Sequence, residues 1–184
     1  MKREIGSWAK VIFVCGFLIW VGLFTNLILR PGENRQAKEQ EKKGDIFFNE
    51  GKPERALVCW RRAIALAPRQ RAPYEKISAY YLLQGQWLEA RKVIEIGLTQ
   101  LPSCANLYFN LGLSYYFSGD YVRARENFGR VTQLDSYYPD AHYFLGLIYR
   151  KEGKPAEANK EFIREVNLDP TSRRAWKEIR KESL

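Results

Sequence analysis

Hydrophobic residues follow two different patterns along the chain. Residues 11–29 form a predominantly apolar run of nineteen residues without a charged side chain, in which Asn26 is the markedly polar member, whereas later apolar residues recur among polar ones. A helix of nineteen residues would span roughly 28 Å, close to the thickness of a bilayer's hydrocarbon core. The mixed pattern that follows is typical of helices that each bury one face. The sequence therefore predicts a transmembrane helix followed by an all-α region.

The flanks of residues 11–29 favour an uncleaved membrane anchor. Arg30 and Pro31 end the run sharply, and Trp8 stands where an interfacial aromatic residue is expected. A cleaved signal peptide would have a shorter apolar core and a small-x-small site after it, and residues 26–31 offer no such site. Basic residues lie on both sides of the run. We therefore expect a single-pass membrane protein, and the side of the membrane on which the repeats lie stays open.

The region after the anchor repeats with a step of 34 residues. Six columns of similar residues keep this register over four copies without an insertion. The columns are Gly44, Ser78, Gly112 and Gly146; Phe47, Tyr81, Tyr115 and Tyr149; Gly51, Gly85, Gly119 and Gly153; Ala56, Ala90, Ala124 and Ala158; Trp60, Ile94, Phe128 and Phe162; and Pro68, Pro102, Ser136 and Pro170. Such regularity indicates four copies of one structural unit.

Each column has a physical reason. A small residue such as Gly112 lets two helices approach closely, and the aromatic residue three positions later, Tyr115, is expected to fill the space beside it. Glycine at the end of the first helix adopts a left-handed C-cap at little cost. Alanine suits the point where the second helix crosses the first, and proline stops that second helix. The pattern predicts four helical hairpins, each covered by its neighbours.

These columns closely resemble the tetratricopeptide repeat (TPR), and the resemblance extends from Ala37 to Ser172. It implies an all-α superhelix of four helix-turn-helix repeats, with Trp176 on a C-terminal helix covering the last repeat. The expected organisation is a basic tail (1–10), a transmembrane helix (11–29), a linker (30–36), four TPR repeats (37–70, 71–104, 105–138 and 139–172) and a capping helix (173–184).

The resemblance also implies a concave groove, lined by the first helix of each repeat, that holds a peptide or helix of a partner protein. The groove positions of this chain are Phe48, Ala79, Leu82, Leu83, Phe109, Leu113, Tyr116, Phe117, Tyr143, Leu147 and Arg150. Their apolar and aromatic character predicts a ligand with bulky apolar side chains, either an amphipathic helix or an extended segment. The alternative is that the protein's own segment near the anchor, or a second copy, covers them.

One subclass of the family binds the C-terminal carboxylate of heat-shock chaperones through a clamp of lysine, asparagine and arginine. Glu41 and Asp45 stand at the first two clamp positions, where lysine and asparagine are required. Acidic side chains there would repel a carboxylate. The sequence therefore argues against a co-chaperone of that kind.

Charge and candidate chemistry narrow the function further. The chain has 30 Lys and Arg against 21 Asp and Glu, a formal charge of +9, which favours acidic partners or anionic lipid. The basic residues are dispersed among acids, so nucleic-acid binding is not expected. Cys15, Cys59 and Cys104 form no CxxC pair, and the single histidine, His142, lies in a packing column. No catalytic motif occurs. We expect no enzyme activity, cofactor or metal.

The sequence thus predicts a membrane-anchored TPR protein that acts as an adaptor or assembly factor by binding a partner protein. Two other roles stay open. One is a permanent accessory subunit of a membrane protein complex, and the other is a chaperone-like holder of unfolded chains. The sequence does not name the partner.

Overall fold

The computed structural model of the protein describes residues 32–181. The chain divides into two compact units, one ending at Ala67 and one beginning at Pro68, and each is described by itself. The predicted transmembrane segment, residues 11–29, lies outside the described residues. Within residues 32–181, no helix combines the length and apolar character that crossing a membrane requires.

The first unit contains one helical hairpin. A helix over residues 32–49 is followed by α2 (Pro53–Leu66), which has proline in its first turn. The indole of Trp60 packs against Gly44, and its Nε1 donates a hydrogen bond to Asp45 Oδ1 at 3.1 Å. The first of these helices already includes residues 32–36, which the repeat pattern assigns to a linker. The region before the first repeat is therefore partly helical.

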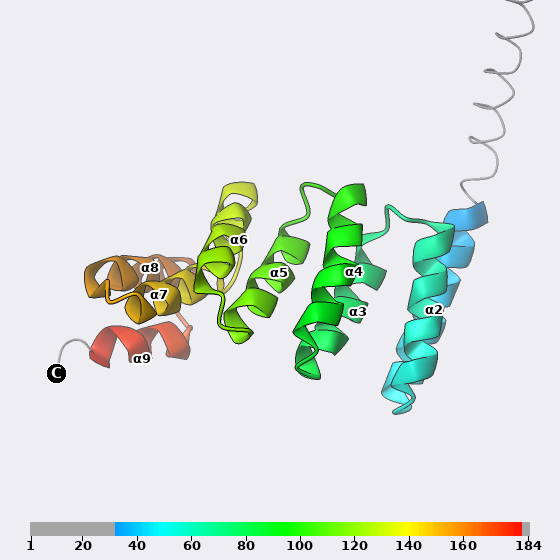
Figure 1. Ribbon diagram of the computed structural model, residues 1–184, viewed down its shortest axis with the longest axis horizontal. Coiled ribbons are helices and arrows are strands. Elements are labelled where there is room, and N and C mark those ends of the chain that lie inside the picture. Colours follow the sequence, from blue (N-terminus) through cyan, green and yellow to red (C-terminus); the bar gives the residue numbers. More distant parts are fainter. Residues whose placement is uncertain (1–31, 182–184) are drawn as a thin grey trace, which may run out of the picture. The chain divides into compact units, whose positions relative to one another are not determined.

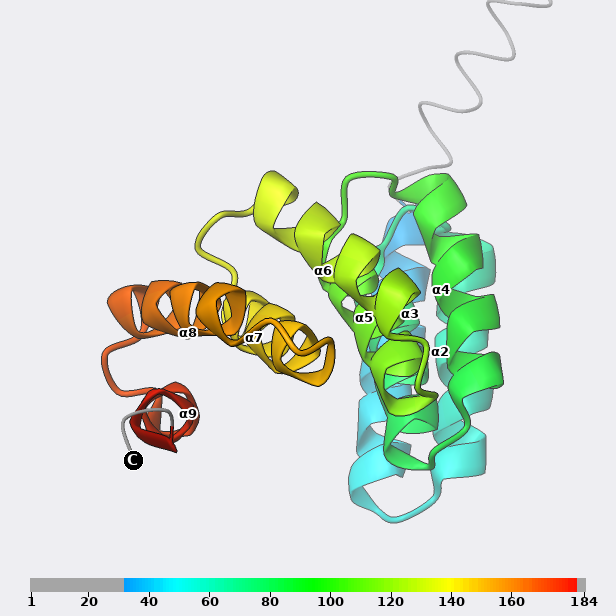
Figure 2. The same ribbon diagram turned by 60° about the vertical axis from the view of Figure 1, so that its left-hand side comes forward.

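The second unit is a series of helical hairpins (Figure 1). Its helices are α3 (Arg71–Leu83), α4 (Trp87–Gln100), α5 (Ala105–Phe117), α6 (Tyr121–Leu134), α7 (Ala141–Lys151), α8 (Pro155–Leu168) and α9 (Arg173–Lys181). α3 packs on α4, α5 on α6 and α7 on α8, while α4 also contacts α5 and α6 contacts α7. α9 packs on α8 at the end of the series, as Figure 2 shows. The predicted all-α repeat fold is confirmed for the described residues.

Glycine ends the first helix of each hairpin, as the pattern predicts. Gly85, Gly119 and Gly153 have φ angles of 69°, 86° and 74°, and Gly51 in the first unit has a φ of 72°. Side chains with a Cβ are disfavoured in this left-handed region. The turn from one helix to the next therefore depends on glycine at these positions.

Close helix approach occurs at the predicted small residues, but a different side chain fills the space. A Cβ added at Gly112 would lie 2.8 Å from Phe128 Cε1, and one at Gly146 would lie 2.5 Å from Phe162 Cε1. The expectation that Tyr115 occupies this space is wrong. The phenylalanines of the second helices point directly at the glycines, so the packing runs across the hairpin and not along one helix.

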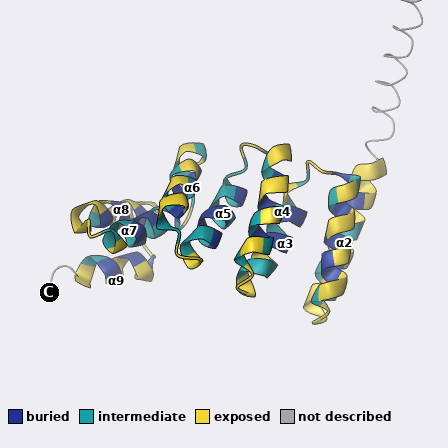
Figure 3. Cartoon of the chain, in the orientation of Figure 1, coloured by how far each residue is buried: buried dark blue, intermediate teal, exposed yellow. Residues whose placement is uncertain are grey.

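Each helix buries a stripe of residues toward its neighbours (Figure 3). Ala90, Ala124 and Ala158, at the predicted crossing points, are all fully buried. α9 differs from the prediction in its packing face. Trp176 is 42% exposed and donates its Nε1 hydrogen to Pro170 O, whereas Ala175 and Glu178 are buried. The last repeat is therefore covered by a small residue and a paired carboxylate, and Trp176 lies at the edge of the contact.

Candidate protein-binding face

The first helices of the second unit, α3, α5 and α7, carry the predicted groove residues of that unit, and we call their outward side the first-helix face. Its members are Ala79, Leu82 and Leu83 on α3; Phe109, Leu113, Tyr116 and Phe117 on α5; and Tyr143, Leu147 and Arg150 on α7. Phe48, the remaining predicted groove residue, belongs to the first unit, where it is 41% exposed beside Trp60. No charged residue occurs from Ala105 to Gly119, so α5 is neutral over its whole length.

Part of the first-helix face also belongs to the core. The ring centroid of Phe109 lies 5.4 Å from Phe128, 4.9 Å from Tyr138 and 5.8 Å from Phe144. Tyr116 lies 5.3 Å from Phe144 in an edge-to-face arrangement. Such aromatic pairs stabilise the packing by about 0.5–1.5 kcal/mol beyond the area that they bury. The aromatic residues of α5 and α7 therefore hold adjacent repeats together as well as forming a surface.

Leu113 packs against the same buried cluster, which includes Ala124 and Leu145. Leu113 and Tyr116 are half-buried, as is Leu82 on α3. Burial also raises the pKa of the Tyr116 hydroxyl. A partner that binds here would contact only the outer edges of these side chains.

Other residues of the face are exposed to solvent. Leu83 is 79% exposed and Phe117 is 54% exposed, and Ala79 is exposed beside Leu83 on α3. Large apolar side chains so open to water are the ones from which a partner would gain most on binding. The available apolar surface therefore lies toward the C-terminal ends of α3 and α5.

Arg150, the charged member of the face, is already paired. Its guanidinium forms an ion pair with Glu178 of α9, whose side chain is 8% exposed. Burial raises the pKa of the Glu178 carboxyl, but hydrogen bonds from Arg150 and Lys181 outweigh burial and hold that pKa below its usual value. Arg150 thus joins α7 to α9, which the repeat pattern did not predict.

Two aromatic residues that the groove mapping does not include lie next to it. Trp87, the first residue of α4, stacks on Phe117 with a centroid distance of 5.4 Å and an interplanar angle of 20°. Tyr121, the first residue of α6, lies 5.6 Å from Tyr116. Trp87 and Tyr121 are 34 residues apart, so they occupy the same position in consecutive repeats. An aromatic residue that recurs at this position could have been recognised from the sequence.

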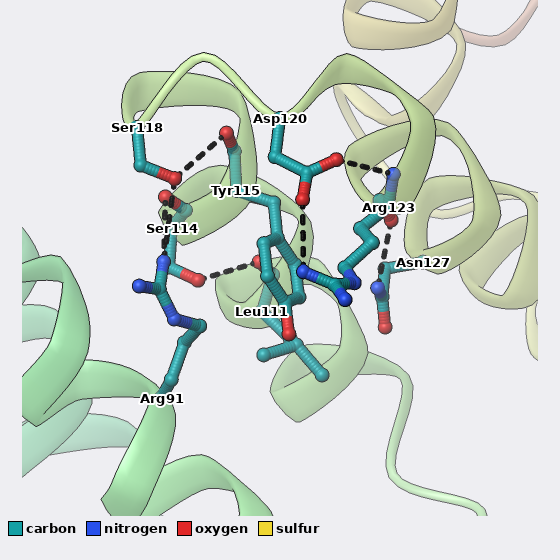
Figure 4. Close-up of polar contacts among 8 residues, drawn as sticks. All are labelled: Arg91, Leu111, Ser114, Tyr115, Ser118, Asp120, Arg123 and Asn127. Carbon is teal, nitrogen blue, oxygen red and sulfur yellow. Dashed lines mark hydrogen bonds and ion pairs between the residues drawn. The ribbon is translucent and has the colours of Figure 1, made fainter.

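Arginines of the second helices join consecutive repeats. Arg91 of α4 donates to Ser118 Oγ at 3.3 Å and lies 5.0 Å from the Tyr115 ring centroid (Figure 4). One repeat later, Arg125 of α6 donates to both carboxylate oxygens of Glu152 at 2.8 Å. These contacts recur at the repeat step, so they fix how each hairpin meets the next. The first-helix face is thereby held in one arrangement within the second unit.

His142 has a structural partner. Its Nδ1 lies 2.6 Å from Glu161 Oε2, and Arg164 contacts the other oxygen of that carboxylate at 2.5 Å. The group lies in an open cavity of about 540 Å³ among α6, α7 and α8. His142 thus joins α7 to α8. Among residues 32–181, no three His, Cys, Asp or Glu side chains are grouped as metal ligands.

Comparisons with known proteins identify the family. A family model described as the tetratricopeptide repeat matches residues 76–139 and 109–172, which together make up more than half of the chain. The protein belongs to the TPR family, whose members are protein-interaction scaffolds.

Curated relatives are much longer than this chain. Human protein O-mannosyl-transferase TMTC1 is 24% identical over 163 residues, which is 79% of this chain and 18% of the relative. The probable peptide N-acetylglucosaminyltransferase SPINDLY of Hordeum vulgare is 25% identical over 134 residues, which is 69% of this chain and 14% of the relative. The chain therefore spans less than a fifth of either protein, and the similarity covers only a segment of each.

Solved structures show the same fold. Pseudomonas aeruginosa pilF is 21% identical with a TM-score of 0.72, over 83% of this chain and 71% of that chain. MamA from Desulfovibrio magneticus RS-1 is 21% identical with a TM-score of 0.63, over 74% and 77%. A TPR protein of Thermus thermophilus is 17% identical with a TM-score of 0.64, over 80% and 82%. At this level of identity the likeness shows the fold alone.

Proposed function

We propose that this TPR scaffold is a membrane-tethered adaptor that binds an apolar helix or extended segment of a partner protein on its first-helix face. The observation that carries the proposal is the neutral, aromatic surface of α5 with Phe117 exposed at its end. On a neutral surface of this kind, charged ligand groups contribute little to the binding free energy, whereas burying apolar side chains contributes much. A partner segment with bulky apolar residues is therefore the ligand that it fits best.

The tether is inferred from residues 11–29, whose uncharged run has the length of a transmembrane helix. Alkaline carbonate extraction of native membranes tests this part of the proposal. The full chain should stay in the membrane pellet, and a chain that begins at residue 32 should be released. Release of the full chain would contradict the anchor and leave the binding proposal untouched.

A charge on the exposed apolar residue tests partner binding. Phe117→Glu places a carboxylate where a partner's apolar side chain would lie, and the loss of one aromatic anchor corresponds to about 2 kcal/mol, or roughly 30-fold in affinity. Co-purification of partners from solubilised native membranes, with quantification of each, gives the readout. Ile163→Glu on α8, where the isoleucine is 44% exposed, makes the same kind of change away from α3, α5 and α7.

The adaptor proposal predicts that one partner is lost with Phe117→Glu and kept with Ile163→Glu, while both variants keep their helical circular dichroism. Equal retention by both variants would contradict binding at the first-helix face. Loss of many unrelated proteins with Phe117→Glu would instead identify a holder of unfolded chains.

A further inference from the structure

The turns within the repeats place a recurring pair of side chains side by side. In each pair, the last residue of one first helix lies against the aromatic residue that begins the second helix of the preceding repeat. Phe117 ends α5 and stacks on Trp87 at 5.4 Å, while Lys151 ends α7 with its Nζ 5.3 Å from the Tyr121 ring centroid. The structural relation is the same in both pairs, but the residue that ends the first helix changes from phenylalanine to lysine.

We call this edge the turn rim and define it as Leu83, Trp87, Phe117, Tyr121 and Lys151. The rim residues that end the first helices are exposed: Leu83 by 79%, Phe117 by 54%, and Lys151 as well. Along the chain the rim therefore changes from two apolar positions to one cation. A ligand that follows the rim meets these two chemistries one repeat apart.

The carboxylates next in sequence to Lys151 and to its ring partner Tyr121 have other partners. Glu152 is bound by Arg125 and by Lys154, and Asp120 at the start of α6 accepts hydrogen bonds from Arg123. Within residues 32–181, no ion pair involves Lys151.

Glu178 of α9 also has other partners, because it forms ion pairs with Arg150 and Lys181. Lys151 therefore offers an ammonium group that is ordered by an aromatic ring and uncompensated by a carboxylate. A cation in this state favours an anionic ligand group.

We propose that the turn rim binds a partner segment that carries a bulky apolar side chain for Phe117 and, one repeat further along, a carboxylate for Lys151. This inference rests on the proposed function, because it specifies the sequence of the apolar segment that the first-helix face binds. Charge complementarity supplies the choice of an acidic side chain. A charge at one end also fixes the direction in which an otherwise apolar ligand lies.

Peptide selection on the full-length chain tests the inference. The chain is held in nanodiscs of zwitterionic lipid, so that lipid charge does not contribute, and is presented with a phage library of randomised 16-residue peptides. Peptides enriched on the wild-type protein should combine apolar residues with an Asp or Glu at a constant spacing. For an enriched peptide, replacing that acid by its amide should weaken binding about threefold to tenfold.

Charge reversal provides the matched comparison. On Lys151→Glu, the enriched peptides should carry Lys or Arg at the position where the acid stood, and on Lys151→Met neither charge should be enriched. Lys160→Glu, an equal change at an exposed residue of α8, should leave the wild-type preference intact. Circular dichroism checks that each variant keeps its helices. If the carboxylate of Lys151→Glu disturbs the end of α7, Lys151→Met still tests the charge, because methionine removes it and keeps a side chain of similar length.

The outcomes separate the inference from the function on which it rests. Enriched peptides that lose binding with Phe117→Glu but show no acid bias, or that keep their bias on Lys151→Glu, would overturn the role of Lys151 alone. Peptides whose binding is unchanged by Phe117→Glu would overturn the proposed binding face, and the inference with it.

Discussion

Gly112→Ala tests the packing that holds the first-helix face together. The new Cβ would lie 2.8, 2.9 and 3.0 Å from three ring atoms of Phe128, which is closer than van der Waals contact allows. Phe128 is fully buried and stacks on Phe144 at 5.1 Å. The ring therefore has little room to move, and its displacement would reach the aromatic cluster of α5 and α7.

The magnitude follows from two opposing effects. Replacing glycine by alanine inside a helix stabilises it by about 0.5–1 kcal/mol. Inserting a methyl group into a packed core costs about 1–3 kcal/mol. The expected net effect at Gly112 is a loss of roughly 0–2.5 kcal/mol in the free energy of unfolding.

Gly129→Ala is the matched control, because Gly129 lies inside α6 and a Cβ there would meet no atom within 4 Å. This variant should be stabilised by about 0.5–1 kcal/mol. Urea unfolding of the full chain in detergent, followed by far-ultraviolet circular dichroism, measures both variants. Gly112→Ala should be the less stable of the two by about 1–3 kcal/mol. Equal stabilisation of the two variants would refute the packing argument at Gly112.

Two further predictions concern the polar contacts. Asp120→Ala removes the side chain that accepts a hydrogen bond from Arg123 N at the start of α6, and it should lower the free energy of unfolding by about 0.5–2 kcal/mol in the same urea assay. No loss would show that water replaces the cap. Glu165 accepts hydrogen bonds from the backbone of Asp140 and Tyr143, yet burial raises its pKa above the usual value. A raised folded-state pKa means that the folded protein binds this proton more tightly, so the contribution of Glu165 to stability falls as pH rises through that pKa. The advantage of wild type over Glu165→Gln should therefore shrink as pH rises from about 4 to about 7, and an advantage that grows with pH would contradict the assignment.

Most of the fold could be predicted because it depends on residues that recur every 34 positions. Gly119 must adopt a positive φ and Ala124 must fit at a helix crossing, so the sequence pattern and the geometry have one cause. Packing partners were harder to predict. Phe128, rather than Tyr115, fills the space beside Gly112, because side-chain direction depends on how two helices cross and not on spacing within one helix.

The candidate site was predictable only in part, for the same reason. The groove positions follow from the repeat register, which places Phe109 and Phe117 on the same helix without distinguishing them. The structure shows Phe109 packed among three aromatic rings and Phe117 exposed at the helix end. The ion pair between Arg150 and Glu178 joins the last repeat to α9, outside the repeat period, so no column of the pattern contains it.

Site-specific photo-crosslinking shows whether a partner protein binds the first-helix face. A benzophenone amino acid replaces Phe117 in one variant and Ile163 in another, and both are irradiated in native membranes. We expect one dominant crosslinked protein at Phe117, attached through an apolar segment that mass spectrometry can map, and none of it at Ile163. The same crosslinked protein from both positions, or none at Phe117, would show that no partner binds specifically at the first-helix face.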